Sequence, residues 1–236
     1  MRKPITFTFL VLYGAFVIWG MTKVPFHPDE SSLLYQSRDL ESLITAPWSL
    51  AWDPAKNEDV DQQYRALNAP LGKYIIGLGR RLFGYGPSSV AVDWNWAKSW
   101  HENASLGALP ERNLLLGGRL AVTLLLPVSL VLMYLCGKEL GGERTGILAA
   151  TFFGFNTLVL IHNRRAMSEG VMTVCLCLSI LGMLIAHRKP LLAGLGASLA
   201  FSAKYSVAPM LLVNLIAIAW IPSSFKREPK RILKNL

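Results

Sequence analysis

The chain has 236 residues, of which 52% are hydrophobic and only 17% are charged, and its formal net charge at pH 7 is +9. Soluble domains carry about 25% charged residues, and here the missing charges leave long apolar runs that only lipid or a very large core could bury. This composition excludes a disordered chain, a coiled coil and a secreted disulfide scaffold, and it indicates an integral membrane protein. The cysteines, which lie in or beside apolar runs and imply no disulfide framework, are Cys136, Cys175 and Cys177.

The first apolar run covers residues 5–21 and follows Arg2 and Lys3. A cleavable signal peptide is the alternative interpretation, but the run ends in Gly20-Met21-Thr22 without a small-x-small cleavage site. We therefore predict a first transmembrane helix at residues 5–21.

Further apolar runs predict transmembrane helices at residues 114–137, 145–161, 170–186, 191–203 and 205–221, followed by a basic tail at 222–236. The last two helices come from one long run that contains a single charge, Lys204, which we interpret as the outer turn of a tight hairpin. The fold class is therefore an all-α polytopic membrane protein with about six transmembrane helices in a single module, residues 1–236.

Loop charges support the six-helix count. With six helices the cytoplasmic side receives eleven Lys or Arg and three Glu, which is +8 of the total +9, whereas five helices would place the basic tail outside. Both termini are then cytoplasmic, and the plasma (inner) membrane is the expected location. The charge excess reports topology, so the sequence indicates a lipid bilayer and no nucleic acid as a partner.

The long segment at residues 22–113 then lies outside the membrane. Apolar residues at helical spacing predict amphipathic helices at 29–44 and 71–83, which would lie in the membrane interface. The acidic patch 53–61 and the Trp-rich stretch 93–100 are interpreted as solvated loops. The acidic patch has no EF-hand spacing, so no metal site is predicted; the sequence leaves a divalent-metal requirement open and indicates no other cofactor.

The strongest local signal is His27-Pro28-Asp29-Glu30, shortly after the first predicted helix. One interpretation is helix capping, with Asp29 as the N-cap and Glu30 in the first turn. The other is a carboxylate at the boundary of water and lipid, where partial desolvation makes it a better base toward a hydroxyl. The two interpretations are compatible.

Together with the Asp-Glu pair, several later motifs resemble the GT-C glycosyltransferases, and most closely the group of protein O-mannosyltransferases and aminoarabinose transferases. These motifs are Ala69-Pro70-Leu71-Gly72-Lys73-Tyr74, Arg119, Arg164-Arg165 with Glu169, and Ala203-Lys204-Tyr205. The mannosyltransferases typically show His-Pro-Pro-Leu-Gly-Lys where this chain has Asn68-Ala69-Pro70-Leu71-Gly72-Lys73. They also carry more membrane helices, so we expect this chain to be the N-terminal module of a longer enzyme or a truncated reading frame.

The resemblance implies sugar transfer from a polyprenyl-phosphate donor to an acceptor hydroxyl on the extracytoplasmic side, by a single inverting displacement. It implies Asp29 as the general base and Glu30 as a second catalytic residue that orients either Asp29 or the acceptor. The candidates that hold the donor phosphate are Lys73, Arg164, Arg165 and Lys204, and the supporting residues are Arg119 and Glu169. The acceptor is a protein, a lipid or a glycan, and the donor sugar is not determined.

Other interpretations remain open. The cations could contact lipid headgroups only. The whole chain could be a non-catalytic membrane protein of the same fold that binds polyprenyl phosphate or a partner subunit. A transporter is disfavoured, because apart from Arg119 no ionisable residue lies deep within a predicted membrane helix.

Overall fold

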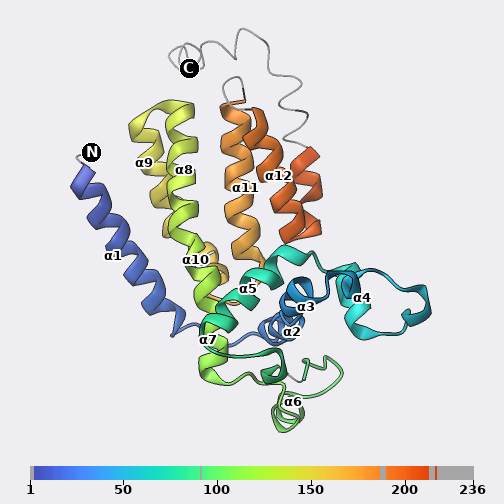
Figure 1. The fold of residues 1–236 in the computed structure, drawn as a ribbon. Helices are drawn as coiled ribbons and strands as arrows, with labels where there is room; N and C mark the ends of the chain where they lie inside the picture. The colour runs from blue at the N-terminus through green and yellow to red at the C-terminus, as the bar shows by residue number, and fades with distance from the viewer. Residues whose placement is uncertain (1–2, 91, 187–189, 213–215, 217–236) are drawn as a thin grey trace.

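The computed structural model describes residues 3–90, 92–186, 190–212 and 216, and within these residues the regular secondary structure is helical. Long apolar helices stand side by side in a bundle, and shorter helices gather at one end of it (Figure 1). The bundle contains α1 (Lys3–Met21), α7 (Arg112–Thr123), α8 (Leu125–Gly141), α9 (Glu143–Gly154), α10 (Thr157–Asn163), α11 (Ser168–Leu184) and α12 (Pro190–Ala203). The short helices belong to residues 22–111, which we call the cap.

One helix of the bundle is long enough to cross a membrane. Helices α7 and α8 form a nearly continuous apolar helix of 30 residues, Arg112–Gly141, whereas a bilayer needs about 20. Helices α9 and α10 pass the same test only as a pair. The apolar parts of α1, α11 and α12 are shorter, so the six-helix topology stays a prediction. Of the predicted sixth helix, 205–221, the structure describes residues 205–212 and 216, which begin with a 3-10 turn at Tyr205–Val207, and the tail 222–236 lies outside the described residues.

The helix expected at 145–161 is broken, because α9 and α10 meet at an angle of 62°. Asn156 lies at the break, and its side-chain Oδ1 accepts hydrogen bonds from the backbone N–H groups of Leu158 and Val159 at 2.9 and 3.2 Å. Asn is a favoured N-cap residue because it satisfies such free N–H groups. A single polar residue in the apolar run therefore starts a new helix in a new direction.

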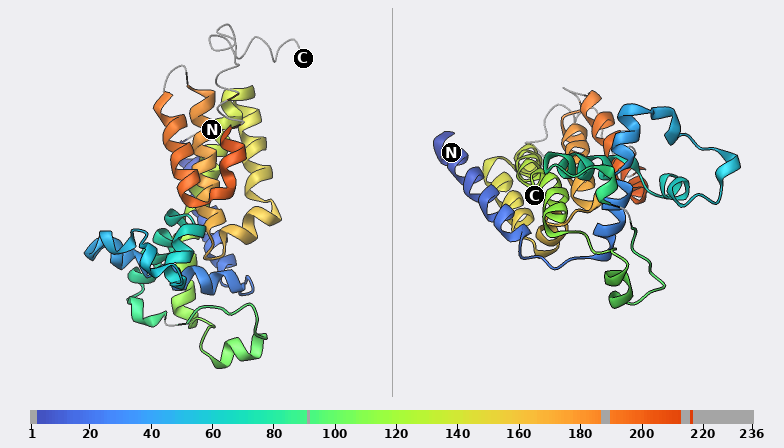
Figure 2. Two further views of the ribbon diagram at one scale, coloured as in Figure 1. Left: turned by 90° about the vertical axis from the view of Figure 1, so that its right-hand side faces the viewer. Right: turned by 60° about the horizontal axis from the view of Figure 1, so that its bottom comes forward.

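The cap contains α2 (Pro28–Gln36), α3 (Asp39–Thr45), α4 (Val60–Leu67), α5 (Pro70–Leu82) and α6 (Trp100–Ser105). It projects sideways from the end of the bundle (Figure 2). The helix expected at 29–44 is divided at Ser37. The Ser37 hydroxyl donates to the carbonyl of Leu34 at 2.6 Å and accepts from Arg80 Nε on α5 at 3.1 Å. Packing against α5 thus ends α2 at Gln36, about two turns earlier than the apolar pattern indicates.

Glycines let the cap approach the bundle closely. Helix α5 crosses α7 where Gly79 faces Gly117, and a Cβ at Gly79 would lie 2.2 Å from the Gly117 carbonyl oxygen. Small residues at such crossings allow backbone contact, as in membrane helix pairs. The core beside this crossing joins α2, α5, α7, α11 and α12, and its fully buried members include Leu34, Ile76, Val122, Val171 and Ala200.

Candidate active site

A cavity of about 360 Å³ lies where the cap meets the end of the bundle. Three of the candidate catalytic, phosphate-binding and supporting residues line it, namely Asp29 on α2, Glu169 on α11 and Lys204 just after α12. The remaining lining residues are Ser32, Leu33, Gln36, Tyr64, Leu67, Asn68, Ala69, Trp96, Met167, Ser168, Ala203, Tyr205 and Ser206. Acid and base side chains from distant parts of the chain therefore share one cavity.

Asp29 is the accessible acid of the cap wall, with a side chain that is 45% exposed. The N-cap of α2 is His27, whose Nδ1 accepts a hydrogen bond from the backbone N–H of Asp29 at 3.2 Å. The Asp29 carboxylate lies 3.5 Å from the same Nδ1. The N-cap position expected for Asp29 therefore belongs to His27. The N-terminal capping interaction of α2 does not use the Asp29 carboxylate. This carboxylate is therefore available to a ligand in the cavity.

Glu30 behaves differently, because it is completely buried. Arg119 Nε and Nη2 donate to its two carboxylate oxygens at 2.7 and 2.6 Å, and the backbone N–H groups of His27 and Ala166 donate to it at 3.0 and 2.8 Å. Arg119, itself 3% exposed, also donates to the carbonyls of Met21, Val24 and Pro25. We call this cluster the Glu30 junction. It joins the start of α2 to α7 and to the loop before α11, and so positions Asp29.

The bundle wall of the cavity carries an ion pair between Glu169 Oε1 and Lys204 Nζ. Their side chains are 24% and 40% exposed, so both stay accessible to solvent. Glu169 lies in the first turn of α11, where an acid is favoured by the free N–H groups of a helix N-terminus. Lys204 directly follows α12, and its partly exposed ammonium group is accessible to an anion in the cavity.

Lys73 lies in the cap and does not line the cavity. It is 2% exposed, and its Nζ donates to Asp39 at 2.7 Å, while Arg65 Nη2 donates to the same carboxylate at 2.9 Å. Burial alone would raise the pKa of Asp39, but the hydrogen bonds and charges of Arg65 and Lys73 outweigh burial and lower it. A phosphate could reach Lys73 only by breaking this network, so the structure favours a role in holding α3, α4 and α5 together.

We expect Asp39→Asn to destabilise the fold near neutral pH and to have no effect at strongly acidic pH. Because the folded-state pKa of Asp39 is depressed, its stabilisation is fully present above the unfolded pKa of about 3.9 and disappears as the pH falls through the lower folded value. Thermal unfolding of the wild type and the variant between pH 7 and pH 2 measures this. The exposed Glu58→Gln serves as control, and a stability difference that is constant over the whole range would contradict the prediction.

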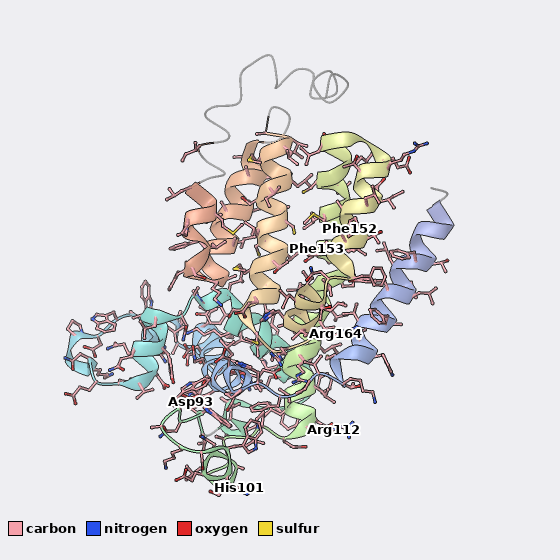
Figure 3. The ribbon with its side chains drawn as sticks, turned by 180° about the vertical axis from the view of Figure 1, so that it is seen from behind. Asp93, His101, Arg112, Phe152, Phe153 and Arg164 are labelled. Atoms are coloured by element: carbon pink, nitrogen blue, oxygen red, sulfur yellow. The ribbon has the colours of Figure 1, made fainter. Side chains whose placement is uncertain are left out.

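Arg164 and Arg165 are also absent from the cavity lining. Arg164 follows α10 (Figure 3) and turns back onto α1, where its Nη2 and Nε donate to the carbonyls of Phe16 and Val17 at 3.2 and 3.3 Å. Its guanidinium lies 4.6 Å from the centre of the Phe16 ring. Among the described residues, the buried Nε of Arg165 has no hydrogen-bond partner. Arg164 thus holds α1 in place. Within the described part of the chain, Arg165 retains a guanidinium nitrogen that is free to donate a hydrogen bond.

Sequence reasoning did not predict several polar or aromatic residues of the lining, above all Gln36, Asn68 and Trp96. Asn68 stands where the mannosyltransferase motif has His, and its Nδ2 donates to Gln36 Oε1 at 3.0 Å. That motif difference was the only available signal. Within the described residues, no group of three His, Cys, Asp or Glu side chains is arranged to hold a metal ion.

The described residues form an apolar helical bundle with one helix long enough to cross a membrane and a cavity with ionisable side chains at one end. A family model described as dolichyl-phosphate-mannose-protein mannosyltransferase matches residues 111–233. This is more than half of the chain, which therefore belongs to that family of GT-C glycosyltransferases. The match includes Arg119, Glu169 and Lys204 but not Asp29. No curated protein and no solved structure matched the chain.

Proposed function

We propose that this chain transfers a sugar from a polyprenyl-phosphate donor to an acceptor hydroxyl in the cavity between cap and bundle. The observation that carries the proposal is the accessible carboxylate of Asp29 in the same cavity as Lys204. A base on one wall and a cation on the other are what transfer from a sugar phosphate requires. Membership of the mannosyltransferase family supports mannose as the first sugar to test and a protein hydroxyl as the first acceptor.

In the proposed reaction, Asp29 takes the proton from the acceptor hydroxyl while the acceptor oxygen forms a bond to the anomeric carbon. The bond from that carbon to the phosphate oxygen breaks on the opposite side, so the configuration inverts. Polyprenyl phosphate leaves with the electron pair, and Lys204 stabilises its added negative charge. Arg165 is the second candidate for this phosphate, whereas Glu30 and Arg119 position Asp29 from the Glu30 junction.

The cavity is proposed to face the extracytoplasmic side of the plasma membrane. The basic loops and tail that the positive-inside rule assigns to the cytoplasm belong to the opposite ends of the predicted helices. A polyprenyl chain could then stay in the bilayer while its sugar phosphate reaches the end of the bundle. The replacement of His by Asn68 in the cap motif leaves lipid and glycan hydroxyls as further candidate acceptors.

The test is transfer by the full chain in proteoliposomes supplied with radiolabelled mannosyl phosphoryl polyprenol and with peptide, lipid or glycan acceptors. Labelled product from any acceptor, with inversion at the anomeric carbon, would support the proposal. Saturable binding of the donor lipid without any product would instead favour the non-catalytic binding protein of the same fold.

We expect Lys204→Met to lower kcat for transfer by about 10²-fold, since it removes one group that stabilises the leaving phosphate. Lys204→Arg should retain a larger part of the activity, because it keeps the positive charge. The readout is initial rate at saturating donor. Lys56→Met, which removes an exposed cation of the cap, is the matched control, and an equal loss in both variants would argue against a phosphate contact at Lys204.

A further inference from the structure

The cavity lining includes a tryptophan from a segment that the sequence analysis interpreted as a solvated loop. Trp96 lines the cavity and is 65% exposed. It belongs to the loop between Asp93 and α6, and Asp93 and His101 mark its two sides in Figure 3. An indole is a large, mostly apolar group, and its exposure in a cavity that also contains charged side chains needs a physical reason.

A loosely held loop is not that reason, because the loop is tied down on its inner side. Asn103 is completely buried. Its Oδ1 accepts from the backbone N–H of Asn95 at 2.8 Å, and its Nδ2 donates to the carbonyls of Asn95 and Ser99 at 2.9 and 3.1 Å. At the start of the loop, the Tyr64 hydroxyl donates to Asp93.

Trp94, two residues before Trp96 in this loop, is also held firmly by its neighbours. Trp94 is 6% exposed and packs against Trp100 and Phe26, with ring centres 5.2 and 6.0 Å away. Its ring centre also lies 6.5 Å from that of Trp96, at an interplanar angle of 65°. The structure thus holds Trp96 in place against a buried aromatic neighbour and leaves much of its surface free.

The polar groups around this surface suit a hydroxyl-rich ligand. Gln36 and Asn68 line the cavity with amides that bond to each other at 3.0 Å and keep further donor and acceptor capacity. Ser32 also lines the cavity, and its buried hydroxyl has no hydrogen-bond partner among the described residues. A buried hydroxyl without a partner is costly unless a ligand satisfies it.

We propose that Trp96 is the stacking platform for the pyranose ring of the transferred sugar, with Ser32, Gln36 and Asn68 bonding to its hydroxyls. A pyranose has one face of C–H groups that packs on an aromatic ring and a rim of hydroxyls that bonds to amides. This assignment rests on the proposed function and adds to it a sugar-binding role for one residue. The sugar would lie against the cap, with its phosphate at Lys204 on the bundle wall.

The test is lipid binding rather than turnover. The full chain in lipid nanodiscs is titrated with mannosyl phosphoryl polyprenol and with bare polyprenyl phosphate, and the ratio of the two affinities measures recognition of the sugar. We expect the wild type to bind mannosyl phosphoryl polyprenol more tightly than bare polyprenyl phosphate. Trp96→Ala should reduce that preference by roughly three- to tenfold, the scale of one aromatic contact, and Trp96→Phe should retain most of it.

Trp48→Ala is the matched control, since Trp48 is 89% exposed in the cap and does not line the cavity. It should leave the preference unchanged. The assignment is overturned if the wild type binds the two lipids with equal affinity or if Trp96→Ala keeps the full preference. It is also overturned if Trp96→Ala lowers the affinity for both lipids by the same factor. Absence of sugar transfer with an intact, Trp96-dependent preference would overturn the proposed reaction but not this sugar contact.

Discussion

Asp29→Asn should lower the rate of sugar transfer by about 10²- to 10⁴-fold, the usual contribution of a general base. The change removes the proton acceptor and almost nothing else. The side chain keeps its size, and His27 continues to cap α2 through the backbone N–H of residue 29. The variant should therefore insert, fold and bind the donor lipid as the wild type does, and lose only kcat.

The measurement is single-turnover transfer with prebound donor, which separates chemistry from binding. Glu58→Gln, an exposed acid elsewhere in the cap, is the neutral control. Glu169→Gln is the decisive comparison, because Glu169 is the other acid in the cavity lining. If Glu169→Gln abolished transfer and Asp29→Asn did not, the base would lie on the bundle wall and our assignment would be wrong.

Arg119→Met should destabilise the protein by about 3–5 kcal/mol, the cost of leaving a buried charge without its partner. Glu30 would remain completely buried and lose both guanidinium hydrogen bonds. The carbonyls of Met21, Val24 and Pro25 would lose their donor as well. Equilibrium unfolding in detergent, followed by far-UV circular dichroism, measures the change.

The double variant Glu30→Gln with Arg119→Met should be less destabilised than the sum of the two single variants, because it leaves no unpaired buried charge. Arg38→Met is the matched control. Arg38 also donates to both oxygens of an acid, Asp61, but each side chain of that pair is 29% exposed. Such pairs contribute about 1 kcal/mol or less. If Arg38→Met and Arg119→Met lowered the free energy of unfolding by similar amounts, the Glu30 junction would contribute no more to stability than an exposed ion pair, contrary to our prediction.

Much of the helical architecture follows from the sequence, because long apolar runs have few alternatives to a helix in lipid. The breaks do not. Asn156 and Ser37 each interrupt a pattern that predicts one continuous helix, and their effect depends on a side-chain cap in one case and on contact with α5 in the other. Periodicity averages over a window and cannot register one residue of this kind.

The candidate site was predictable to a similar extent. Membrane topology alone assigned seven candidate residues to one side, and three of them, Asp29, Glu169 and Lys204, line one cavity. The partner of each charge was not predictable. Lys73 is paired with Asp39, and Arg119 with a residue 89 positions earlier, since such pairs depend on how helices cross. Trp96 was missed because its loop is held by Asn103, which carries no recognisable motif.

The Glu30 junction also implies an order of assembly. One oxygen of Glu30 accepts from the backbone N–H of Ala166, which is 136 residues further along the chain. A nascent chain emerges from its N-terminus, so Glu30 must wait, without its final partners, until α7 and the loop before α11 have been synthesised. Asp29, the proposed base, is adjacent to Glu30 and is made early, whereas the groups that fix the Glu30 junction are made later. Until α11 and Lys204 have been synthesised, the cavity has only one of its two walls.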